Sequence, residues 1–332
     1  MIIQSKKVLR YYLYKQLLSS PTPRDLNLLD IIDRAGFPKE QNASLSFYLR
    51  KENFEQNELL EALTKNEIIE VKTFKNKRLI VPKDLARDFI KFIPQKNHSD
   101  TVKSCAKFIF QDLKKEPKTQ SQILRNFAEY AIEIKKHAID YLESQGKILR
   151  IYNFADKKFE FVLTQEILGP DLYQKLDVQI LAKIIHLTIQ YYGPLRISDL
   201  VKYSGINSIE IQKAFKYIRN KVASIKIDSS LTPYLIDGKD LANLQVHKSP
   251  SIDFINILPK SDHALSISQD WLYKSIPLYG KLNLLVIFNG EVVGGFSDMG
   301  GFDNFVLLPK LVLNEISNKH TTLLQWMKRK LI

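Results

Sequence analysis

The stretch from Asp177 to Leu241 constrains the fold of this chain most, because its helix and strand signals follow one another in a fixed order. It opens on apolar residues that recur at i, i+4, i+7 and i+11, the spacing of one face of an α-helix. These residues are Ile180, Ile184, Leu187 and Tyr191. The dipeptide Gly193-Pro194 follows and ends the predicted helix.

Two shorter helices and a pair of strands are predicted next. Ser198 can cap a second helix that ends at Gly205. Asn207 and Glu210 form a capping-box pair for a third helix. That helix is expected to bury Ile211, Phe215, Ile218 and Val222. The alternating sequences VASIKID and PYLID then predict a β-hairpin. Helices followed by a hairpin in this order are typical of a winged-helix domain, where the hairpin covers the apolar faces of the helices.

The same closing pattern, an amphipathic helix followed by a hairpin, occurs twice more. One helix begins near Glu58 and its hairpin turns at residues 75–77; the other ends at Gly146 and its hairpin turns at residues 155–157. This loose internal repeat predicts an α+β chain, mainly helical, with three tandem winged-helix domains and a small C-terminal β-domain. The predicted boundaries are 1–98, 101–165 and 176–245 for the winged helices, and 250–332 for the β-rich domain with its terminal helix.

The charge of the chain predicts a polyanionic partner. The 332 residues carry a formal net charge of +13, and an excess of cations of this size favours nucleic acid. A chain from an organism whose proteins are generally rich in lysine would have the same net charge without binding a polyanion. The charge is therefore informative only together with the predicted winged helices. The two signals together favour double-stranded DNA as the partner.

Other classes of protein are excluded by simple features. No apolar run approaches the roughly 20 residues that a membrane span needs. The single cysteine, Cys105, excludes a disulfide framework and fits a reducing cytoplasm. The six histidines lie far apart in the sequence, so we expect no metal site. We expect a cytoplasmic monomer, nucleoid-associated when bound to DNA, with no cofactor.

The order of these segments resembles that of the AlkZ/YcaQ-type tandem winged-helix DNA glycosylases. The sequence SLSFYLRKENFEQNELLEAL is similar to the family's Leu-Trp-Ala-Arg-like segment, with Phe47, Tyr48 and Arg50 at the matching places. RLIVPKDL resembles its first wing strand, and YYGPLRISDLVKYSGI resembles its Gly-Pro-led third winged helix. INILPKSDHAL with YGKLNLLVIFNGEVVGGFSD resembles its closing β-region. The likeness extends over most of the chain.

The resemblance implies a DNA-repair enzyme that hydrolyses the N-glycosidic bond of an alkylated or crosslinked base in duplex DNA. In that family a Gln-x-Gln or Gln-x-Asp motif precedes the Leu-Trp-Ala-Arg-like segment and is held to position the attacking water. No such motif lies between Leu26 and Arg50. One alignment places Glu40 and Gln41 there, and another places Asp33 there.

An acid beside an amide would suit this reaction. The transition state resembles an oxocarbenium ion, so a nearby carboxylate can stabilise its charge and orient water. A cationic N-alkylpurine leaves with little help from a general acid. Glu40 with Gln41 supplies this chemistry, and Asp33 is the competing catalytic candidate. The alternative is that Glu40 and Gln41 are solvated loop residues and Asp33 is a solvent-facing helix residue.

Basic and polar side chains on the predicted third helices and wings are candidates for DNA contact. The third helix of a winged helix commonly enters the major groove, while the wing meets phosphates. The candidates are Arg50, Lys72, Lys75, Lys77, Arg78, Lys135, Lys136, Lys157, Lys158, Gln212, Lys213, Lys216 and Arg219. Any one of them can instead be an ordinary solvated charge, and winged helices also dock proteins.

Three hypotheses follow. The first is a DNA glycosylase. The second is a non-catalytic winged-helix DNA-binding protein, regulatory or architectural, on the same scaffold. The third is a winged-helix assembly factor for transcription. The missing glutamine motif leaves open whether catalysis is retained.

We predict that duplex DNA binds with an affinity that falls steeply as salt rises, because lysine and arginine contacts release condensed counterions. Lys77→Ala should lower the slope of log affinity against log salt by about one unit, with little change in sequence preference. Fluorescence anisotropy across a salt series measures both. An affinity that does not respond to salt would exclude the polyanion hypothesis.

Overall fold

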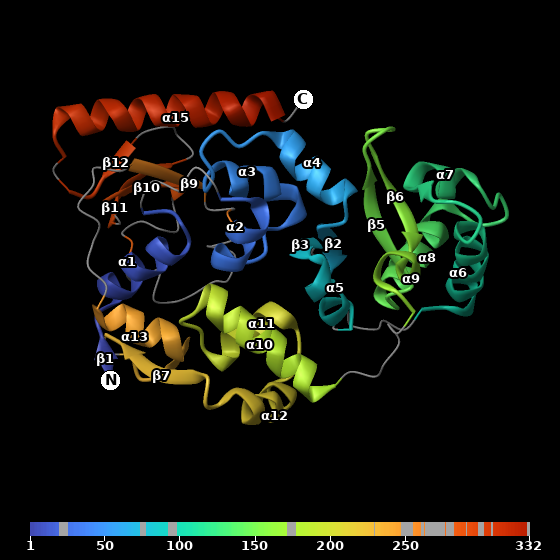
Figure 1. The fold of residues 1–332 in the computed structure, drawn as a ribbon, viewed down its shortest axis with the longest axis horizontal. Coiled ribbons are helices and arrows are strands. Elements are labelled where there is room, and N and C mark those ends of the chain that lie inside the picture. Colours follow the sequence, from blue (N-terminus) through green and yellow to red (C-terminus); the bar gives the residue numbers. More distant parts are fainter. Residues whose placement is uncertain are drawn as a thin grey trace. The chain divides into compact units, whose positions relative to one another are not determined.

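The computed structural model describes residues 1–19, 26–73, 78–91, 98–170, 177–228, 230–246, 255–259, 262, 276, 282–289, 291–297, 302–306 and 308–330, the side chains of 328–330 excepted. The chain is α+β, with helices predominating (Figure 1). Its contacts divide it into two compact units. Unit 1 comprises residues 1–38, 42–54 and 185–332, and unit 2 comprises residues 39–41 and 55–184.

The predicted three helices and hairpin of residues 177–241 are present. Helix α10 (Val178–Tyr192) is followed by α11 (Ile197–Ser204), α12 (Ser208–Ile218), β7 (Val222–Ile227) and β8 (Tyr234–Asp237). The two strands pair antiparallel. In addition, Leu195 bridges Leu235, which joins the segment between α10 and α11 to the hairpin. The local signals of this stretch therefore predicted its elements and their order.

The start of α11 differs from the prediction, whereas the predicted Asn207 cap and Gly205 stop are present. Arg196, and not Ser198, is the N-cap of α11, because the Asp199 carboxylate reaches back to the Arg196 backbone N–H at 2.9 Å. At α12 the Asn207 side chain accepts a hydrogen bond from the Glu210 N–H at 2.9 Å. Gly205 ends α11 in the left-handed conformation, at φ 73°, which glycine adopts without a steric penalty.

The buried face of α12 is also shifted. Ile211 and Ile218 are buried as predicted, but Phe215 is only half-buried and Ala214 lies in the core instead. Val222, at the start of β7, is half-buried as well. The centre of the apolar stripe therefore runs through Ala214, and Phe215 lies at its margin.

The N-terminus of the chain belongs to the same sheet. Strand β1 (Ile2–Ile3) pairs parallel with β7, so the sheet order is β1-β7-β8. Helix α1 (Ser5–Lys15) follows β1, and α13 (Gly238–Val246) follows β8. Apolar residues of both helices and both strands share one core with the C-terminal strands. The short strand β1 was not predicted, because two residues carry no periodicity.

The C-terminal part of unit 1 is an antiparallel sheet covered by a long helix. The strands β9 (Ile255–Pro259), β10 (Leu282–Phe288), β11 (Glu291–Ser297) and β12 (Phe302–Asn304) are arranged in the order β12-β11-β10-β9. Helix α15 (Lys310–Lys330) contacts β9, and Ile316 and Leu323 of this helix enter the core of the sheet. Tyr48 of α3 (Ala43–Tyr48) stacks on Trp326 at a centroid distance of 4.4 Å.

In unit 2, both predicted hairpins form and join into one sheet. Helix α4 (Gln56–Thr64) precedes β2 (Ile68–Lys72) and β3 (Arg78–Pro82), and α5 (Lys83–Ile90) follows them. The second set comprises α6 (Asp100–Leu113), β4 (Lys118–Thr119), α7 (Gln120–Arg125), α8 (Ile132–Ser144), β5 (Ile148–Asn153), β6 (Lys158–Leu163) and α9 (Thr164–Leu168). The sheet order is β3-β2-β5-β6-β4, and Glu70 of β2 pairs with Arg150 of β5. Residues 1–98, predicted as one unit, are thus divided between the two units.

Candidate functional site

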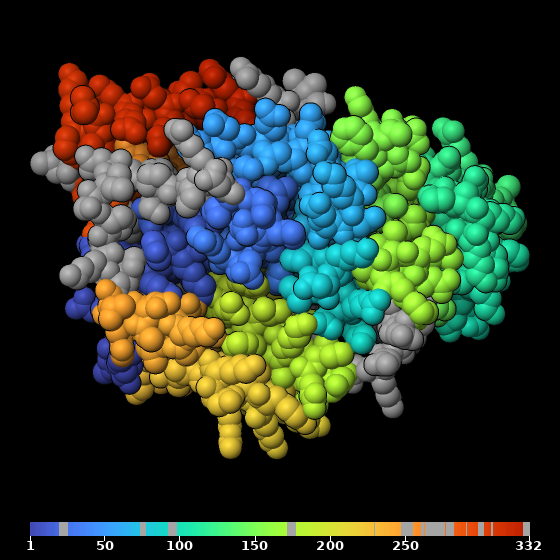
Figure 2. Space-filling view, in the orientation of Figure 1, coloured from blue at the N-terminus to red at the C-terminus, as the bar shows by residue number. Residues whose placement is uncertain are grey.

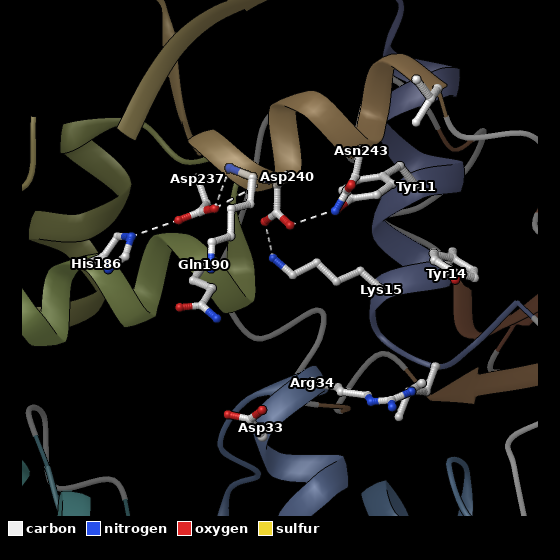
Figure 3. Close-up of a pocket in the computed structure, with 13 residues that line it drawn as sticks. Tyr11, Tyr14, Lys15, Asp33, Arg34, His186, Gln190, Asp237, Asp240 and Asn243 are labelled. Carbon is white, nitrogen blue, oxygen red and sulfur yellow. Dashed lines mark hydrogen bonds and ion pairs between the residues drawn. The ribbon is translucent and has the colours of Figure 1, made fainter. Parts of the chain in front are cut away.

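Unit 1 contains a pocket of about 690 Å³ between residues of α1, α2 (Leu28–Ala35), α10 and α13. Most of its lining is polar or charged. The lining residues are Tyr11, Tyr14, Lys15, Leu17, Asp33, Arg34, His186, Gln190, Asp237, Lys239, Asp240, Asn243 and Val246. Figure 3 shows side chains from all four helices facing this space. The volume lies within the range of small-molecule sites, roughly 300–1,000 Å³.

One wall carries an ion pair between Lys15, the last residue of α1, and Asp240 in the first turn of α13. The side chains are only 13% and 11% exposed. The Tyr11 hydroxyl donates a hydrogen bond of 2.8 Å to the other oxygen of Asp240. Burial, together with the negative charge of Asp240, raises the pKa of Tyr11. The tyrosine therefore stays protonated and orients the carboxylate towards Lys15.

A second carboxylate, Asp237, lies beside this pair at the start of α13. Its Oδ1 accepts a hydrogen bond of 2.8 Å from the Lys239 backbone N–H, and its Oδ2 lies 2.8 Å from Nε2 of His186. A carboxylate at a helix N-terminus is stabilised by the exposed N–H groups there. Asp237 thus fixes the orientation of the His186 ring on the pocket wall.

Asp33 and Gln190 line the same pocket from α2 and α10 (Figure 3). Asp33 is exposed and Gln190 is half-buried. Within the described part of the chain, no hydrogen bond or ion pair engages either side chain. The pocket therefore combines an uncommitted carboxylate with an uncommitted amide.

Glu40 and Gln41 belong to unit 2, whereas Asp33 belongs to unit 1. Glu40 accepts a 2.8 Å hydrogen bond from Nη2 of Arg150, and the same nitrogen contacts the fully buried carboxylate of Glu70 at 2.8 Å. Burial raises the pKa of Glu70, an effect opposed by Arg150 and Arg78. Gln41 is exposed. Glu40 is thus paired with Arg150, while Gln41 faces solvent.

Four of the predicted DNA-contacting residues are instead buried or paired. Lys72 contacts Asp140 at 2.7 Å and Glu143 at 3.3 Å. Arg78 contacts Glu70 at 2.9 Å and Glu143 at 2.6 Å. The Lys135 ammonium donates to the carbonyls of Leu124 and Asn126 at 2.7 and 2.9 Å. The fourth is Arg50, which is fully buried. These four side chains are engaged by partners within the chain, and their contact with DNA stays a prediction.

Arg50 forms a bidentate ion pair with Asp262 at 2.7 and 2.9 Å, and both side chains are buried. Its Nε also donates to the Gln16 carbonyl at 3.0 Å, and its Nη1 donates to the Ser46 carbonyl at 2.9 Å. Every nitrogen of the guanidinium therefore has an acceptor inside unit 1.

The other candidates are exposed where they are described. They are Lys136, Lys157, Lys158, Gln212, Lys213, Lys216 and Arg219. Lys136 pairs with Glu133 at 2.8 Å. In Figure 2 the yellow segment that includes α12 lies at the surface of unit 1 with long side chains projecting from it. Lys75 and Lys77 lie outside the described residues.

The sequence reasoning missed the Lys15, Asp237, Asp240, His186 and Gln190 side chains. Asp237 and Asp240 flank the start of α13 in the sequence IDGKDL, so a local signal for a helix N-terminus was present. What brings Lys15 to Asp240 is the packing of α1 on α13, across 225 residues of sequence. Only the tertiary structure reveals that contact.

The described residues contain neither a metal-binding group nor a membrane-spanning helix. Among the described residues, no group of three or more histidine, cysteine, aspartate or glutamate side chains is arranged to bind a metal ion. None of the helices in the described ranges combines the length and the apolar composition that crossing a bilayer requires.

Comparison with solved structures gives a likeness of fold. No protein-family model matches the chain, and no curated protein matches it. The solved structure of the Streptomyces sahachiroi DNA glycosylase AlkZ matches with a TM-score of 0.67 and 13% sequence identity, over 90% of this chain and 88% of that chain. This chain has the AlkZ fold. The resemblance to the AlkZ/YcaQ-type proteins is therefore confirmed at the level of the fold.

We predict that Arg50→Met lowers the free energy of unfolding by about 3–5 kcal/mol, because it leaves the Asp262 carboxylate buried without its partner. Urea unfolding followed by circular dichroism measures the change. Arg50→Met combined with Asp262→Leu should recover much of the loss, and Lys213→Met on exposed α12 should change stability by no more than about 0.5 kcal/mol. Unchanged stability together with weakened DNA binding would instead place Arg50 at the DNA interface.

Proposed function

We propose that this protein binds duplex DNA and hydrolyses the N-glycosidic bond of an alkylated or crosslinked base. The observation that carries the proposal is the pocket of unit 1, where Asp33 and Gln190 face the same space without other partners in the described chain. The AlkZ fold supports the same conclusion, because the matching protein is a DNA glycosylase.

The pocket chemistry suits a base that has left the helix. Enzymes that act on a base extrude it from the duplex into a pocket. As the bond between base and sugar breaks, positive charge develops on the sugar, and a preorganised carboxylate stabilises that charge. In this proposal Asp33 is that carboxylate, and Gln190 helps it to orient the attacking water. A base that is already cationic through alkylation needs no proton donor.

Asp33 is preferred to Glu40 for two reasons. The Glu40 carboxylate is engaged by Arg150 at 2.8 Å, so moving it towards a substrate would break an ion pair. Asp33 lines a pocket large enough for an extruded base, and the pocket of unit 1 does not include Glu40.

DNA contact is assigned to exposed cations on three-helix-and-hairpin segments, which we propose to be winged helices. On α12 these are Lys213, Lys216 and Arg219, with Gln212 beside them. At the β5–β6 turn they are Lys157 and Lys158. The helix would enter a groove and the hairpin would contact phosphates. The division of the chain into three tandem winged helices and a C-terminal β-domain stays part of this proposal.

The second candidate function is a non-catalytic DNA-binding protein on the same scaffold. The absence of a Gln-x-Gln or Gln-x-Asp motif before Arg50 favours it. The two functions differ in a single observable, the release of a free base from damaged duplex.

We predict that Asp33→Asn lowers the rate of base release from duplex carrying N7-methylguanine by roughly a hundred- to a thousandfold, the usual effect of losing one electrostatic contact to the transition state. DNA affinity should hold or rise slightly, since the variant removes a negative charge. Chromatography of released 7-methylguanine gives the rate, and fluorescence anisotropy gives the affinity.

Glu40→Gln is the matched control, because it makes the same change of carboxylate to amide in unit 2. It should retain base release. A loss with Glu40→Gln and full activity with Asp33→Asn would transfer the catalytic role to Glu40. An unaltered protein that releases no base from several alkylated duplexes would support the non-catalytic function.

A further inference from the structure

Lys15 has no role in the hydrolysis proposed above, although its ammonium lies on the pocket wall. It ends α1, its side chain is 13% exposed, and it lines the same space as Asp33 and Gln190. Figure 3 shows the side chain extending from α1 across the pocket to Asp240. Lysines such as Lys213 and Lys216 on α12 are exposed instead. Lys15 is therefore a primary amine held inside a substrate-sized pocket.

The surroundings of Lys15 favour its reactivity. Burial lowers the pKa of its amine, while the charge of Asp240 opposes this effect. A desolvated lysine is the usual form of a Schiff-base nucleophile. Asp240 is in direct contact with the amine and is held in place by the Tyr11 hydroxyl at 2.8 Å, so it can accept the ammonium proton.

We propose that Lys15 forms a Schiff base with the aldehyde carbon of an abasic deoxyribose in DNA, so that the pocket also cleaves the strand at an abasic site. The substrate class is the ring-opened sugar that remains after a base is lost. This inference extends the proposed function, since base hydrolysis would leave such a sugar in the same pocket. It does not require base release, because abasic sites also arise from other sources.

The reaction balances without any cofactor. The Lys15 ammonium passes a proton to Asp240, and the free amine attacks the C1′ aldehyde to give a carbinolamine. Return of the proton from Asp240 expels water and leaves a protonated imine. The Asp240 carboxylate then removes a proton from C2′, and the electron pair shifts to break the bond between C3′ and the phosphate oxygen. The 3′ phosphate of the sugar departs as a 5′-phosphorylated strand end. Water finally hydrolyses the imine and releases Lys15.

The test uses the full chain and a duplex with a preformed abasic site, made by removing a single uracil enzymatically. Sodium borohydride reduces a Schiff base to a stable secondary amine, so the unaltered protein should become covalently attached to the DNA. Proteolysis and mass spectrometry of the product should place the attachment on Lys15. Without borohydride, the same duplex should be cleaved at the abasic site.

Lys15→Arg keeps a cation beside Asp240 but cannot form an imine, so attachment and strand cleavage should both fall to the background level. Lys7→Arg is the matched control, because Lys7 also lies on α1 but is exposed and is not among the residues that line this pocket; it should retain attachment. Circular dichroism of each variant reports folding, and the mass-spectrometric mapping needs no variant. Attachment at another lysine, or no attachment of the unaltered protein, would overturn the proposal.

The outcome is independent of the proposed hydrolysis, since no base is released in this experiment. Attachment at Lys15 by a protein that releases no 7-methylguanine would support the lyase and reject the glycosylase. Base release without attachment would support the glycosylase and reject the lyase.

Discussion

The buried ion pair between Arg50 and Asp262 is the interaction on which the structure of unit 1 depends. It joins residues 212 apart in sequence, and Arg50 also holds the carbonyl of Gln16, directly after α1. The Gln16 side chain in turn donates to the Tyr191 carbonyl of α10 at 2.7 Å. A buried network in which each guanidinium nitrogen has an acceptor fixes the elements that it connects. It holds the C-terminal end of α1, and hence Lys15, against α10.

The opposite wall of the pocket is fixed to α10 as well. Gly36, directly after α2, packs so closely on Tyr191 that an added Cβ would lie 2.9 Å from the Tyr191 Cβ. The Phe37 N–H donates to the Tyr192 hydroxyl at 3.1 Å. Because α1 and α2 are both anchored to the end of α10, Lys15, Asp33 and Gln190 lie on walls with defined positions. Preorganisation of this kind is what electrostatic catalysis requires.

The sequence predicted the helices and strands whose signals lie in neighbouring residues. It did not predict contacts between residues that are far apart in the sequence. Helix α12 and its hairpin followed from apolar spacing and from Asn207, although Phe215 lies at the edge of the stripe rather than in its centre. A charged residue such as Arg50 has the sequence signature of a surface residue, and only Asp262 explains its burial. The union of two hairpins through Glu70 and Arg150, and the pairing of Lys15 with Asp240, depend equally on partners far along the chain. Asp33 was a catalytic candidate from one alignment with the family motif. Gln190 was identified only by its position in the pocket.

The central claim is that the pocket of unit 1 receives the damaged nucleotide. Amide hydrogen exchange tests it directly, with the protein bound either to intact duplex or to the same duplex carrying a tetrahydrofuran abasic analogue, which cannot form an imine. We predict that peptides covering residues 28–35 and 238–246 exchange more slowly on the lesion duplex than on the intact one, because α2 and α13 line the pocket. Equal exchange of these peptides on the two duplexes would contradict the account.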